Sequence, residues 1–298
     1  MRSKKLKVRS QEFEMTNNMF SHVDETLVNA LKEDLGSGDV TTAALIPEDH
    51  VSEALMIAKE DIVLAGLPFA ERVFHLVDNS LKFRALIGEG SKVRKGSIIA
   101  RVKGKTGSLL IAERTVLNIL QRMSGIAGLT NEYIKAVRGL HVEITDTRKT
   151  SPGLRFFDKY AVRVGGGRNH RHGLYDGVLI KDNHIAAAGG VRKAVKLARS
   201  RAHHLLKIEV EVKNITEVKE ALSAGADIIM LDNMDVKLMK KAAGIIREKN
   251  PDVLIEASGN MNLKNIREVA ETGVDLISVG ALTHSAPAAD LSLQIRSA

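Results

Sequence analysis

The chain has 298 residues, a length that suggests about two domains, although one β/α barrel of about 250 residues also fits. It contains no cysteine, which excludes disulfides, cysteine-ligated zinc and a thiol nucleophile. With no tryptophan and 3% aromatic residues, a surface for stacking nucleic-acid bases is hard to build. The formal net charge of +8 calls for an anionic partner, which is nucleic acid, a membrane surface or a small anionic substrate.

The positive charge is concentrated in two segments. Residues 1–10 carry a net charge of +5, residues 148–172 carry +6, and the rest of the chain is net negative at −3. We predict that residues 1–17 form a basic flexible tail. No run of about 18 apolar residues and no secretory signal pattern occurs, so we expect a cytoplasmic protein without a membrane span.

The first part of the chain, to about residue 125, mixes helical and strand-like patterns. The expected elements are a helix at 24–35, two short strands within 53–66, a helix at 67–77, strands and tight turns within 88–104, and a helix at 108–125. The last helix has a wide apolar stripe, with Ser108 placed to cap its start and Gly125 to end it.

From about residue 141, short apolar runs alternate with helical segments. The expected strands are 142–145, 177–180, 207–212, 227–231, 253–257 and 275–279. The expected helices are 191–202, 217–225, 236–249 and 263–273. Residues 224–229 are echoed at 272–277, two βα units later, which indicates a barrel or a doubly wound sheet. No GxGxxG motif follows a strand, which disfavours a dinucleotide-binding fold.

Small and acidic residues follow these predicted strands, where a parallel βα array collects its functional groups. The turns at 258–260 (Ser-Gly-Asn) and 280–281 (Gly-Ala) offer backbone N–H groups to a phosphate, although short βα turns favour such residues in any case. Glu211 and Asp232, one βα unit apart, suit Mg²⁺ carried on a polyphosphate. The alternative is that Asp232 caps a helix and Glu211 pairs with a lysine.

The basic segment contains two kinds of position. Arg148 and Lys149 follow a predicted strand, and three glycines at 165–167 precede the Arg168–His172 run, so these cations are candidates for binding carboxylate or phosphate. The other cations fall on a predicted helix, where a solvated basic face is the ordinary explanation: Arg155, Lys159 and Arg163.

Two further positions carry weaker signals. His170 and His172 are spaced to face a metal together, but no third strong ligand is near them in sequence, so we do not expect them to bind one. Arg114 lies beside Glu113 in the predicted helix at 108–125, which by itself indicates a surface charge or a salt bridge.

Taken together, these motifs resemble those of the quinolinate phosphoribosyltransferase family, the carboxylating nicotinate-nucleotide pyrophosphorylases of NAD biosynthesis. The resemblance runs from about residue 22 to the end of the chain and leaves out only the basic tail. The motifs that carry it occur in order at 33–42, 112–115, 146–155, 165–171, 181–184, 209–212, 231–233, 256–260 and 278–284.

The resemblance implies an α/β fold with an N-terminal sandwich-like α/β domain at 18–126 and a C-terminal irregular β/α barrel at 127–285. We expect a C-terminal helix at 286–298 to complete the first domain. The family also implies a homodimer with shared active sites, in which one subunit's N-terminal domain covers its neighbour's barrel. The sequence leaves open whether the assembly is a dimer or a hexamer.

The implied reaction joins quinolinate and phosphoribosyl pyrophosphate, with Mg²⁺, into nicotinate mononucleotide, pyrophosphate and CO₂. Carried over residue by residue, the quinolinate contacts are Arg114 (from the partner subunit), Arg148, Lys149, His170 and Arg171. The contacts to phosphoribosyl pyrophosphate are Lys149, Lys181, Ser258, Gly259, Asn260, Val279, Gly280, Ala281 and His284. Glu211 and Asp232 would position the ribose and the Mg²⁺, directly or through water.

Three rivals are weighed against this interpretation. A paralogue associated with molybdenum transport shares the scaffold, but the complete cationic set favours quinolinate. A non-carboxylating nicotinate phosphoribosyltransferase holds one carboxylate, for which five cationic or ionisable contacts are excessive. A nucleic-acid-binding protein is disfavoured by the scarcity of aromatic residues and by the acidic remainder of the chain.

Overall fold

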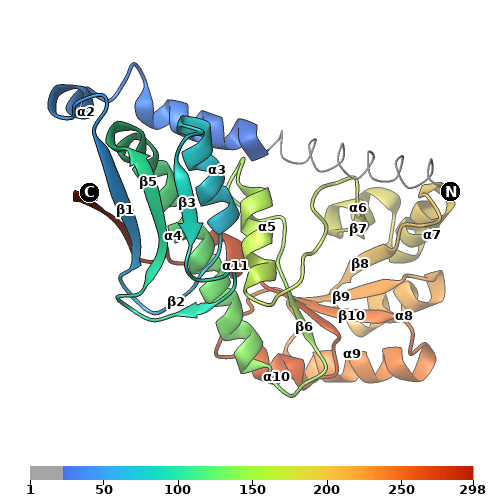
Figure 1. Ribbon diagram of the computed structural model, residues 1–298. Coiled ribbons are helices and arrows are strands. Elements are labelled where there is room, and N and C mark those ends of the chain that lie inside the picture. The colour runs from blue at the N-terminus through green and yellow to red at the C-terminus, as the bar shows by residue number, and fades with distance from the viewer. Residues whose placement is uncertain (1–22, 298) are drawn as a thin grey trace, which may run out of the picture. The chain divides into compact units, whose positions relative to one another are not determined.

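The computed structural model describes residues 23–297, and the predicted tail at 1–17 lies outside the described residues. The chain forms two compact units (Figure 1). The N-terminal unit runs to Gly125 and takes in the segment from Ala288, and the C-terminal unit is Ile126–Pro287. Within residues 23–297, no helix combines the length and the apolar composition needed to cross a membrane.

The N-terminal unit is built on an antiparallel sheet in the order β12-β1-β5-β3, and it also contains a two-stranded β2-β4 ribbon. Its strands are β1 (Val51–Ala58), β2 (Ile62–Val63), β3 (Lys82–Ala85), β4 (Lys92–Val93), β5 (Ile98–Lys105) and β12 (Leu291–Ser297). Its helices are a helix at 23–35, α2 (Val40–Leu45), α3 (Leu67–Val77) and the first part of α4 (Thr106–Ala136).

One face of this sheet packs on helices. The Phe74 ring of α3 lies 6.1 Å from the Phe83 ring of β3, centroid to centroid, so Phe83 points to the helix side. Val102, which pairs with Phe83 across the sheet, is fully buried. Successive residues of a strand alternate between faces, so the neighbours of Phe83 and Val102 point to the opposite side.

The last strand corrects the C-terminal helix that we predicted at 286–298. Residues Leu291–Ser297 form β12, which pairs antiparallel with β1 along its length. Leu291 and Leu293 are buried whereas Gln294 is exposed, so the apolar residues recur every second position, as in a strand with one buried face. The segment completes the N-terminal unit as an edge strand.

The long helix α4 also differs from the prediction of a helix at 108–125. It continues through Gly125, because buried residues such as Ile126 extend its apolar stripe, and their burial offsets the cost of about 1 kcal/mol of a glycine in a helix. Ser108 does not cap the helix; its hydroxyl donates to Asp78 Oδ2 at 2.9 Å. The boundary between the two units falls inside α4.

In the C-terminal unit, all six predicted apolar runs form strands of one parallel sheet, in the order β6-β11-β10-β9-β8-β7. The strands are β6 (Glu143–Thr145), β7 (Val178–Ile180), β8 (Ile208–Val212), β9 (Ile228–Asp232), β10 (Leu254–Ser258) and β11 (Leu276–Ser278). The helices are α5 (Arg155–Val164), α6 (Asp182–Ala188), α7 (Val191–Arg201), α8 (Ile215–Ala224), α9 (Val236–Lys249), α10 (Ile266–Ala270) and α11 (Ala281–His284).

This sheet and its helices form an irregular β/α barrel. Arg168 makes an additional parallel bridge to Thr145, on the side of β6 that β11 leaves open. Every residue of β8 is buried, as expected for a strand covered on both faces. Because the strands are parallel, their carboxyl ends gather on one side, and the polar residues that follow them are brought together there.

Candidate active site

A cavity of about 480 Å³ opens at the carboxyl ends of the barrel strands. Ten of the residues predicted for the site line it: Arg148, Lys149, His170, Arg171, Lys181, Glu211, Asp232, Ser258, Gly259 and Asn260. The lining also contains six residues outside that prediction: Thr147, Leu179, Met230, Asn233, Glu256 and Ser278. The barrel topology therefore gathers residues from all six strands of the sheet or the turns that follow them at one opening.

The other predicted residues lie outside this lining. Four of them follow β11: Val279, Gly280, Ala281 and His284. A Cβ at Gly280 would come within 3.2 Å of Lys149 Cδ, and the Thr283 hydroxyl donates to the Lys149 carbonyl at 2.8 Å, so this turn lies against Lys149. Arg114 is an exposed residue of α4 in the N-terminal unit, and its action in a partner's site stays a prediction.

The backbone of Val279 is already engaged in the sheet. Its N–H donates to the Thr145 carbonyl at 2.9 Å, which continues the β11–β6 pairing by one residue. This N–H is therefore not available to a phosphate. Any phosphate contact from this turn falls to Gly280 and Ala281.

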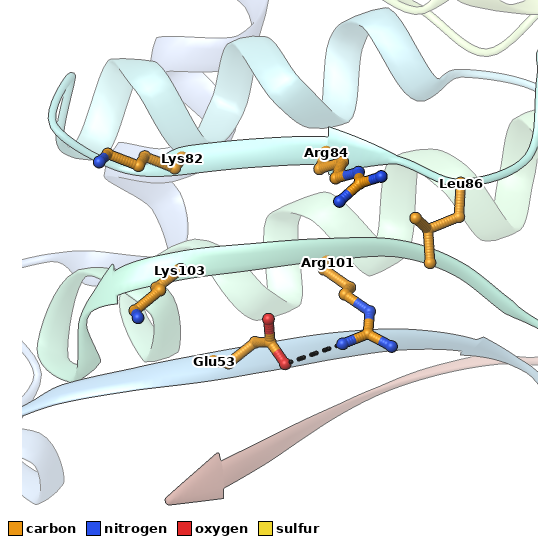
Figure 2. A pocket seen from close by; sticks show the side chains of 6 residues that line it. All are labelled: Glu53, Lys82, Arg84, Leu86, Arg101 and Lys103. Carbon is orange, nitrogen blue, oxygen red and sulfur yellow. Dashed lines mark hydrogen bonds and ion pairs between the residues drawn. The ribbon is translucent and has the colours of Figure 1, made fainter. Parts of the chain in front are cut away.

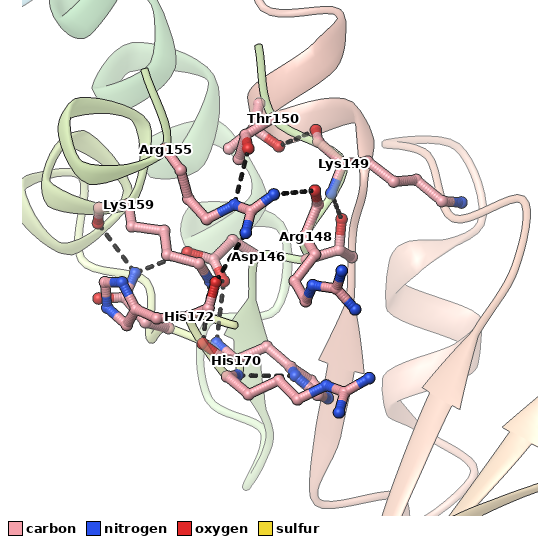
Figure 3. A network of polar contacts seen from close by, with 12 residues as sticks. Asp146, Arg148, Lys149, Thr150, Arg155, Lys159, His170 and His172 are labelled. Carbon is pink, nitrogen blue, oxygen red and sulfur yellow. Dashed lines mark hydrogen bonds and ion pairs between the residues drawn. The ribbon is translucent and has the colours of Figure 1, made fainter. Parts of the chain in front are cut away.

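A buried ion pair positions the basic segment (Figure 3). Lys159 of α5 donates to Asp146 Oδ1, and both side chains are fully buried. Asp146 also accepts from the backbone N–H of His170 at 2.9 Å and from the Asn169 amide at 2.6 Å. The Lys159 ammonium additionally donates to the His170 carbonyl at 2.9 Å. The loop that carries His170 and Arg171 is thus held from both sides.

This pair corrects the interpretation of Lys159 as part of a solvated basic face. Burial raises the pKa of Asp146 and lowers the pKa of Lys159, and the ion pair opposes both shifts. Arg155 is half-buried and donates to the Thr150 hydroxyl at 3.0 Å and to the His172 carbonyl at 2.9 Å, so it also supports the loop. Of the three helix cations, only Arg163 is exposed.

Two guanidinium groups face the cavity close to each other. Burial and the positive charge of Arg148 lower the pKa of Arg171, although nearby carboxylates oppose this shift. Arg171 donates from Nη1 to the Gly177 carbonyl at 2.8 Å, while the Nε atoms of both Arg148 and Arg171 are buried without a hydrogen-bond partner. A bound carboxylate would satisfy these donors and offset the repulsion.

His170 is held by protein groups at both ring nitrogens. Its Nδ1 accepts from the Arg171 backbone N–H at 2.8 Å, so the proton of the neutral ring resides on Nε2. Nε2 lies 3.1 Å from Glu209 Oε2 and 3.8 Å from Glu256 Oε1. Although burial lowers the pKa of His170, these two carboxylates raise it by more, and the net shift is upward.

The two carboxylates behind His170 are themselves buried. Glu209 is 5% exposed and Glu256 is 1% exposed, and each has an Oε1 atom without a hydrogen-bond partner. Burial and the neighbouring Glu209 raise the pKa of Glu256 to about 8, so it is protonated at neutral pH. A proton on Glu256 lets it donate a hydrogen bond, which two ionised carboxylates cannot do.

The same three groups are the described residues whose ligand atoms cluster as a metal site would require, all within 4.8 Å of one another. The tautomer of His170 argues against metal binding there, because a metal would need the Nε2 lone pair and would place the proton on Nδ1, against the Arg171 N–H. His172, the other residue of the predicted H-x-H pair, is not in the cluster.

Glu211 and Asp232 are two further carboxylates of the cavity lining. Lys181, at the end of β7, forms an ion pair with Glu211 of β8. Asp232 ends β9 and is half-buried, and its Oδ1 accepts from the Asn233 amide at 3.0 Å. The predicted pairing of Glu211 with a lysine is therefore present, and both partners belong to the cavity.

The turn after β10 has the open backbone of an anion-binding loop. Gly259 and Asn260 adopt positive φ angles of 95° and 52°, and Asn233, across the cavity edge, has φ 52°. Asn260 donates from its side chain to Asn233 Oδ1 at 3.1 Å. A Cβ at Gly259 would lie 2.2 Å from the same oxygen. The turn after β10 can therefore pack this closely against Asn233 only with glycine at position 259.

Several of the residues now seen at the site were missed as functional residues in the sequence. Glu209 and Glu211 are two residues apart and therefore point to the same face of the strand. The alternation of the strand cannot tell which of them is functional. Glu256 lies in an apolar run that predicts a buried strand. Because acidic residues are rarely buried without a partner, its position could have marked it as functional. Asp146 and Lys159 are 13 residues apart, and only the fold brings them into contact.

The fold and the cavity define a class of protein. The cations, carboxylates and small turns that line this one cavity form a site for a compact polyanion at the mouth of a β/α barrel. Family models match both units: "Quinolinate phosphoribosyl transferase, C-terminal domain" over residues 126–294, and the N-terminal domain of the same name over residues 39–124. The chain belongs to the quinolinate phosphoribosyltransferase family.

Named relatives are similar in sequence to this protein along nearly the whole chain. A probable nicotinate-nucleotide pyrophosphorylase [carboxylating] of Synechocystis is 47% identical over 273 residues, which cover 92% of each chain. A mitochondrial quinolinate phosphoribosyltransferase [decarboxylating] of Nicotiana tabacum is 44% identical over 98% of this chain and 88% of its own. The structure of the nicotinate-nucleotide pyrophosphorylase from Francisella tularensis has a TM-score of 0.87 at 42% identity, over 93% of this chain and 96% of that one.

Proposed function

We propose that this chain transfers the phosphoribosyl group of phosphoribosyl pyrophosphate to quinolinate, with loss of CO₂, and so makes nicotinate mononucleotide for NAD biosynthesis. The observation that carries the proposal is the cavity itself. It brings Arg148, Lys149 and Arg171 together with Glu211 and Asp232 in one lining, and the Nε atoms of both arginines are without a hydrogen-bond partner. Quinolinate carries two neighbouring carboxylates, one of which is beside its ring nitrogen, and the arginine forks suit these groups.

In the first step, the ring nitrogen of quinolinate attacks the anomeric carbon of the donor. The bond from that carbon to the pyrophosphate oxygen breaks, and pyrophosphate leaves with the electron pair. Lys149 and Lys181 offset the negative charge on the leaving group, and Glu211 and Asp232 face the positive charge that develops on the ribose. Holding both reactants in one cavity makes the encounter oriented and effectively intramolecular.

In the second step, the bond between the ring and the carboxylate beside the nitrogen breaks. The electron pair remains on the ring carbon, where the adjacent pyridinium nitrogen stabilises it until water supplies a proton. No protein base is needed for this step. The role of Arg148 and Arg171 is to hold the other carboxylate, which stays in the product.

Mg²⁺ is part of the proposal. Two carboxylates of neighbouring strands at one cavity edge suit a hard cation that arrives on a polyphosphate, and the Lys181 contact leaves a second Glu211 oxygen for it. Bound there, Mg²⁺ would neutralise charge on the pyrophosphate group, directly or through water.

A homodimer with shared sites is also proposed. Arg114 is exposed on α4 and lies outside the cavity lining, which accords with a role in a neighbouring subunit. The cytoplasmic location stays a prediction, and among the relatives two Nicotiana tabacum proteins are named as mitochondrial.

The decisive experiment follows CO₂ and nicotinate mononucleotide with quinolinate, phosphoribosyl pyrophosphate and Mg²⁺. We expect stoichiometric amounts of both products. Nicotinate is the matched control substrate, because it has the ring and one carboxylate but no carboxylate beside the nitrogen. Turnover of nicotinate without turnover of quinolinate would overturn the proposal and favour the non-carboxylating alternative.

A further inference from the structure

A second cationic depression lies in the N-terminal unit, on the sheet face away from the helices (Figure 2). It has a volume of about 500 Å³ and is lined by Glu53 of β1, Lys82, Arg84 and Leu86 of β3 and the loop after it, and Arg101 and Lys103 of β5. We call these six residues the sheet groove. All of them belong to one compact unit.

The strand register explains why the cations gather. Lys82 pairs directly with Lys103, and Arg84 pairs directly with Arg101. Residues opposite each other in an antiparallel pair point to the same face, with Cβ atoms about 5 Å apart. The residues between them, such as Phe83 and Val102, point to the helices, so the two basic pairs stand side by side on the open face.

The repulsion within these two pairs destabilises the sheet when no anion is bound. Like charges directly opposite each other destabilise a sheet. Within the described part of the chain, the groove contains a single carboxylate, Glu53, whose Oε2 lies 3.3 Å from Arg101 Nη1. Glu53 also lies directly opposite Lys103 across the β1–β5 pair, whereas Lys82 and Arg84 have no ion pair with a carboxylate among those residues, so the repulsion is only partly compensated.

We propose that the sheet groove binds a compact anion carrying two or more phosphate groups. Four cations around one depression offer the charge that such an anion carries, and the volume lies in the range of small-molecule sites. A bound polyphosphate places negative charge between the opposed pairs and removes their repulsion. The site is separate from the barrel cavity and does not depend on the reaction proposed for it.

The shape of the groove favours a small anion over a nucleic acid. Its cations are confined to two short strands, whereas a nucleic acid needs a track of positive charge along its backbone. No aromatic side chain is among the lining residues to stack a base. The recognised chemistry is therefore the phosphate group, whether it comes from inorganic polyphosphate or from a nucleotide.

The test uses the full chain and inorganic tripolyphosphate in isothermal titration calorimetry. The variant Lys82→Glu/Arg84→Glu turns both like-charged pairs into pairs of opposite charge. We expect it to bind one equivalent of tripolyphosphate fewer than the wild-type protein, and its Tm in the absence of ligand to rise by a few degrees. Turnover in the barrel cavity should be unchanged, because neither residue belongs to it.

Two controls separate a site from general electrostatics. Lys219→Glu/Lys240→Glu makes the same change in net charge on exposed positions of α8 and α9, and should keep the wild-type stoichiometry. Lys82→Arg/Arg84→Lys keeps the charges and should keep the binding. ATP serves as a second probe: equal affinity for ATP and tripolyphosphate identifies the phosphates as the recognised part, and tighter binding of ATP identifies a nucleotide.

The proposal fails if the charge-reversed variant binds as many equivalents as the wild type, or if the helix control loses binding to the same extent. It also fails if an oligonucleotide of about twelve residues binds the groove more tightly than tripolyphosphate, since that result assigns the face to nucleic acid. Because binding is measured without turnover, these outcomes are independent of the activity of the barrel cavity.

Discussion

Lys159 Nζ and Asp146 Oδ1 form an ion pair in which both side chains are fully buried, behind the loop that presents His170 and Arg171. A buried ion pair is a poor source of net stability, because the desolvation of both charges offsets their attraction. The contribution of this ion pair is to position the loop that carries His170 and Arg171. Asp146 accepts from the backbone N–H of His170 and Lys159 donates to its carbonyl, so the ion pair holds the backbone of the loop at this residue.

Breaking this pair should therefore cost both stability and activity. We expect Lys159→Met to lower the free energy of unfolding by about 3–5 kcal/mol, because Asp146 is left as an uncompensated buried charge. Urea denaturation measures the loss. Arg163→Met, on the exposed face of the same helix, should change stability by no more than about 0.5 kcal/mol.

The double variant Asp146→Asn/Lys159→Met tests the cause. It removes both charges, so it should recover most of the stability that Lys159→Met loses, while turnover stays low because the loop is no longer held. A double variant as unstable as the single one would show that Lys159 acts through packing and not through the ion pair.

Glu256 predicts a pH dependence of stability. Burial and the neighbouring Glu209 raise the pKa of Glu256 from 4.5 to about 8, so the folded protein keeps a proton that the unfolded chain releases. The stabilisation from this proton is complete below about pH 4.5 and is lost as the pH rises through about 8. At about 1.4 kcal/mol per pKa unit, the loss is of the order of a few kcal/mol.

The matched variant is Glu256→Gln, which keeps the shape and a donor but cannot titrate. Its free energy of unfolding, measured in urea at pH 5.5, 7 and about 8.5, should fall less steeply than that of the wild type. Glu248→Gln, at an exposed position of α9, should leave the slope unchanged. Equal slopes for the wild type and Glu256→Gln would mean that Glu256 is ionised in the folded protein.

Local patterns predicted the elements that depend on short-range signals. The βα alternation located every strand of the barrel, because a strand buried on both faces has a continuous apolar run. The helix predicted at 286–298 was wrong because a single edge strand with few apolar residues has a weak period, and its partner β1 is more than 200 residues earlier in the chain. A local sequence pattern cannot predict that two strands so far apart in the chain will pair.

The sequence could also predict that residues at the strand ends would come together in one cavity, whereas their roles stay predictions. Residues at strand ends are brought together by any parallel barrel, so Lys181, Glu211 and Asp232 converge as expected. Lys159 was misjudged because a lysine on an amphipathic helix has the same pattern whether it meets water or a buried carboxylate. Whether Lys159 is exposed or buried depends on its long-range contact with Asp146, which no sequence motif indicates.

The ion pair between Lys181 and Glu211 joins the proposed phosphate and metal contacts. We expect Glu211→Gln to lower kcat/KM for phosphoribosyl pyrophosphate by about 100-fold, because it removes a charge that faces the reacting ribose and a ligand for Mg²⁺. Steady-state kinetics at several Mg²⁺ concentrations measures this effect, and the concentration needed for half-maximal rate should rise. Glu268→Gln, exposed on α10, is the control.

Removal of the metal provides the companion test. Chelation with EDTA should stop turnover of the wild type, and added Mg²⁺ should restore it. If the rate is unaffected by EDTA, or if Glu211→Gln keeps the wild-type dependence on Mg²⁺, then Glu211 does not hold the metal.

The position of Arg114 predicts complementation between subunits. Arg114→Ala and Arg171→Ala should each be inactive alone, since both are proposed to hold quinolinate. In a mixed dimer, the Arg114→Ala subunit has an intact cavity and receives Arg114 from its partner, so one of the two sites works. Random mixing makes half of the dimers mixed, so recovery of about a quarter of wild-type activity is expected.

The control for this experiment mixes Arg148→Ala with Arg171→Ala. Both residues line the same cavity within one subunit, so each cavity of a mixed dimer lacks one of them and no activity should return. Recovery in the first mixture alone assigns Arg114 to the neighbouring subunit's site. If neither mixture recovers after exchange of subunits has been verified by mass, Arg114 acts within its own chain and the shared site is wrong.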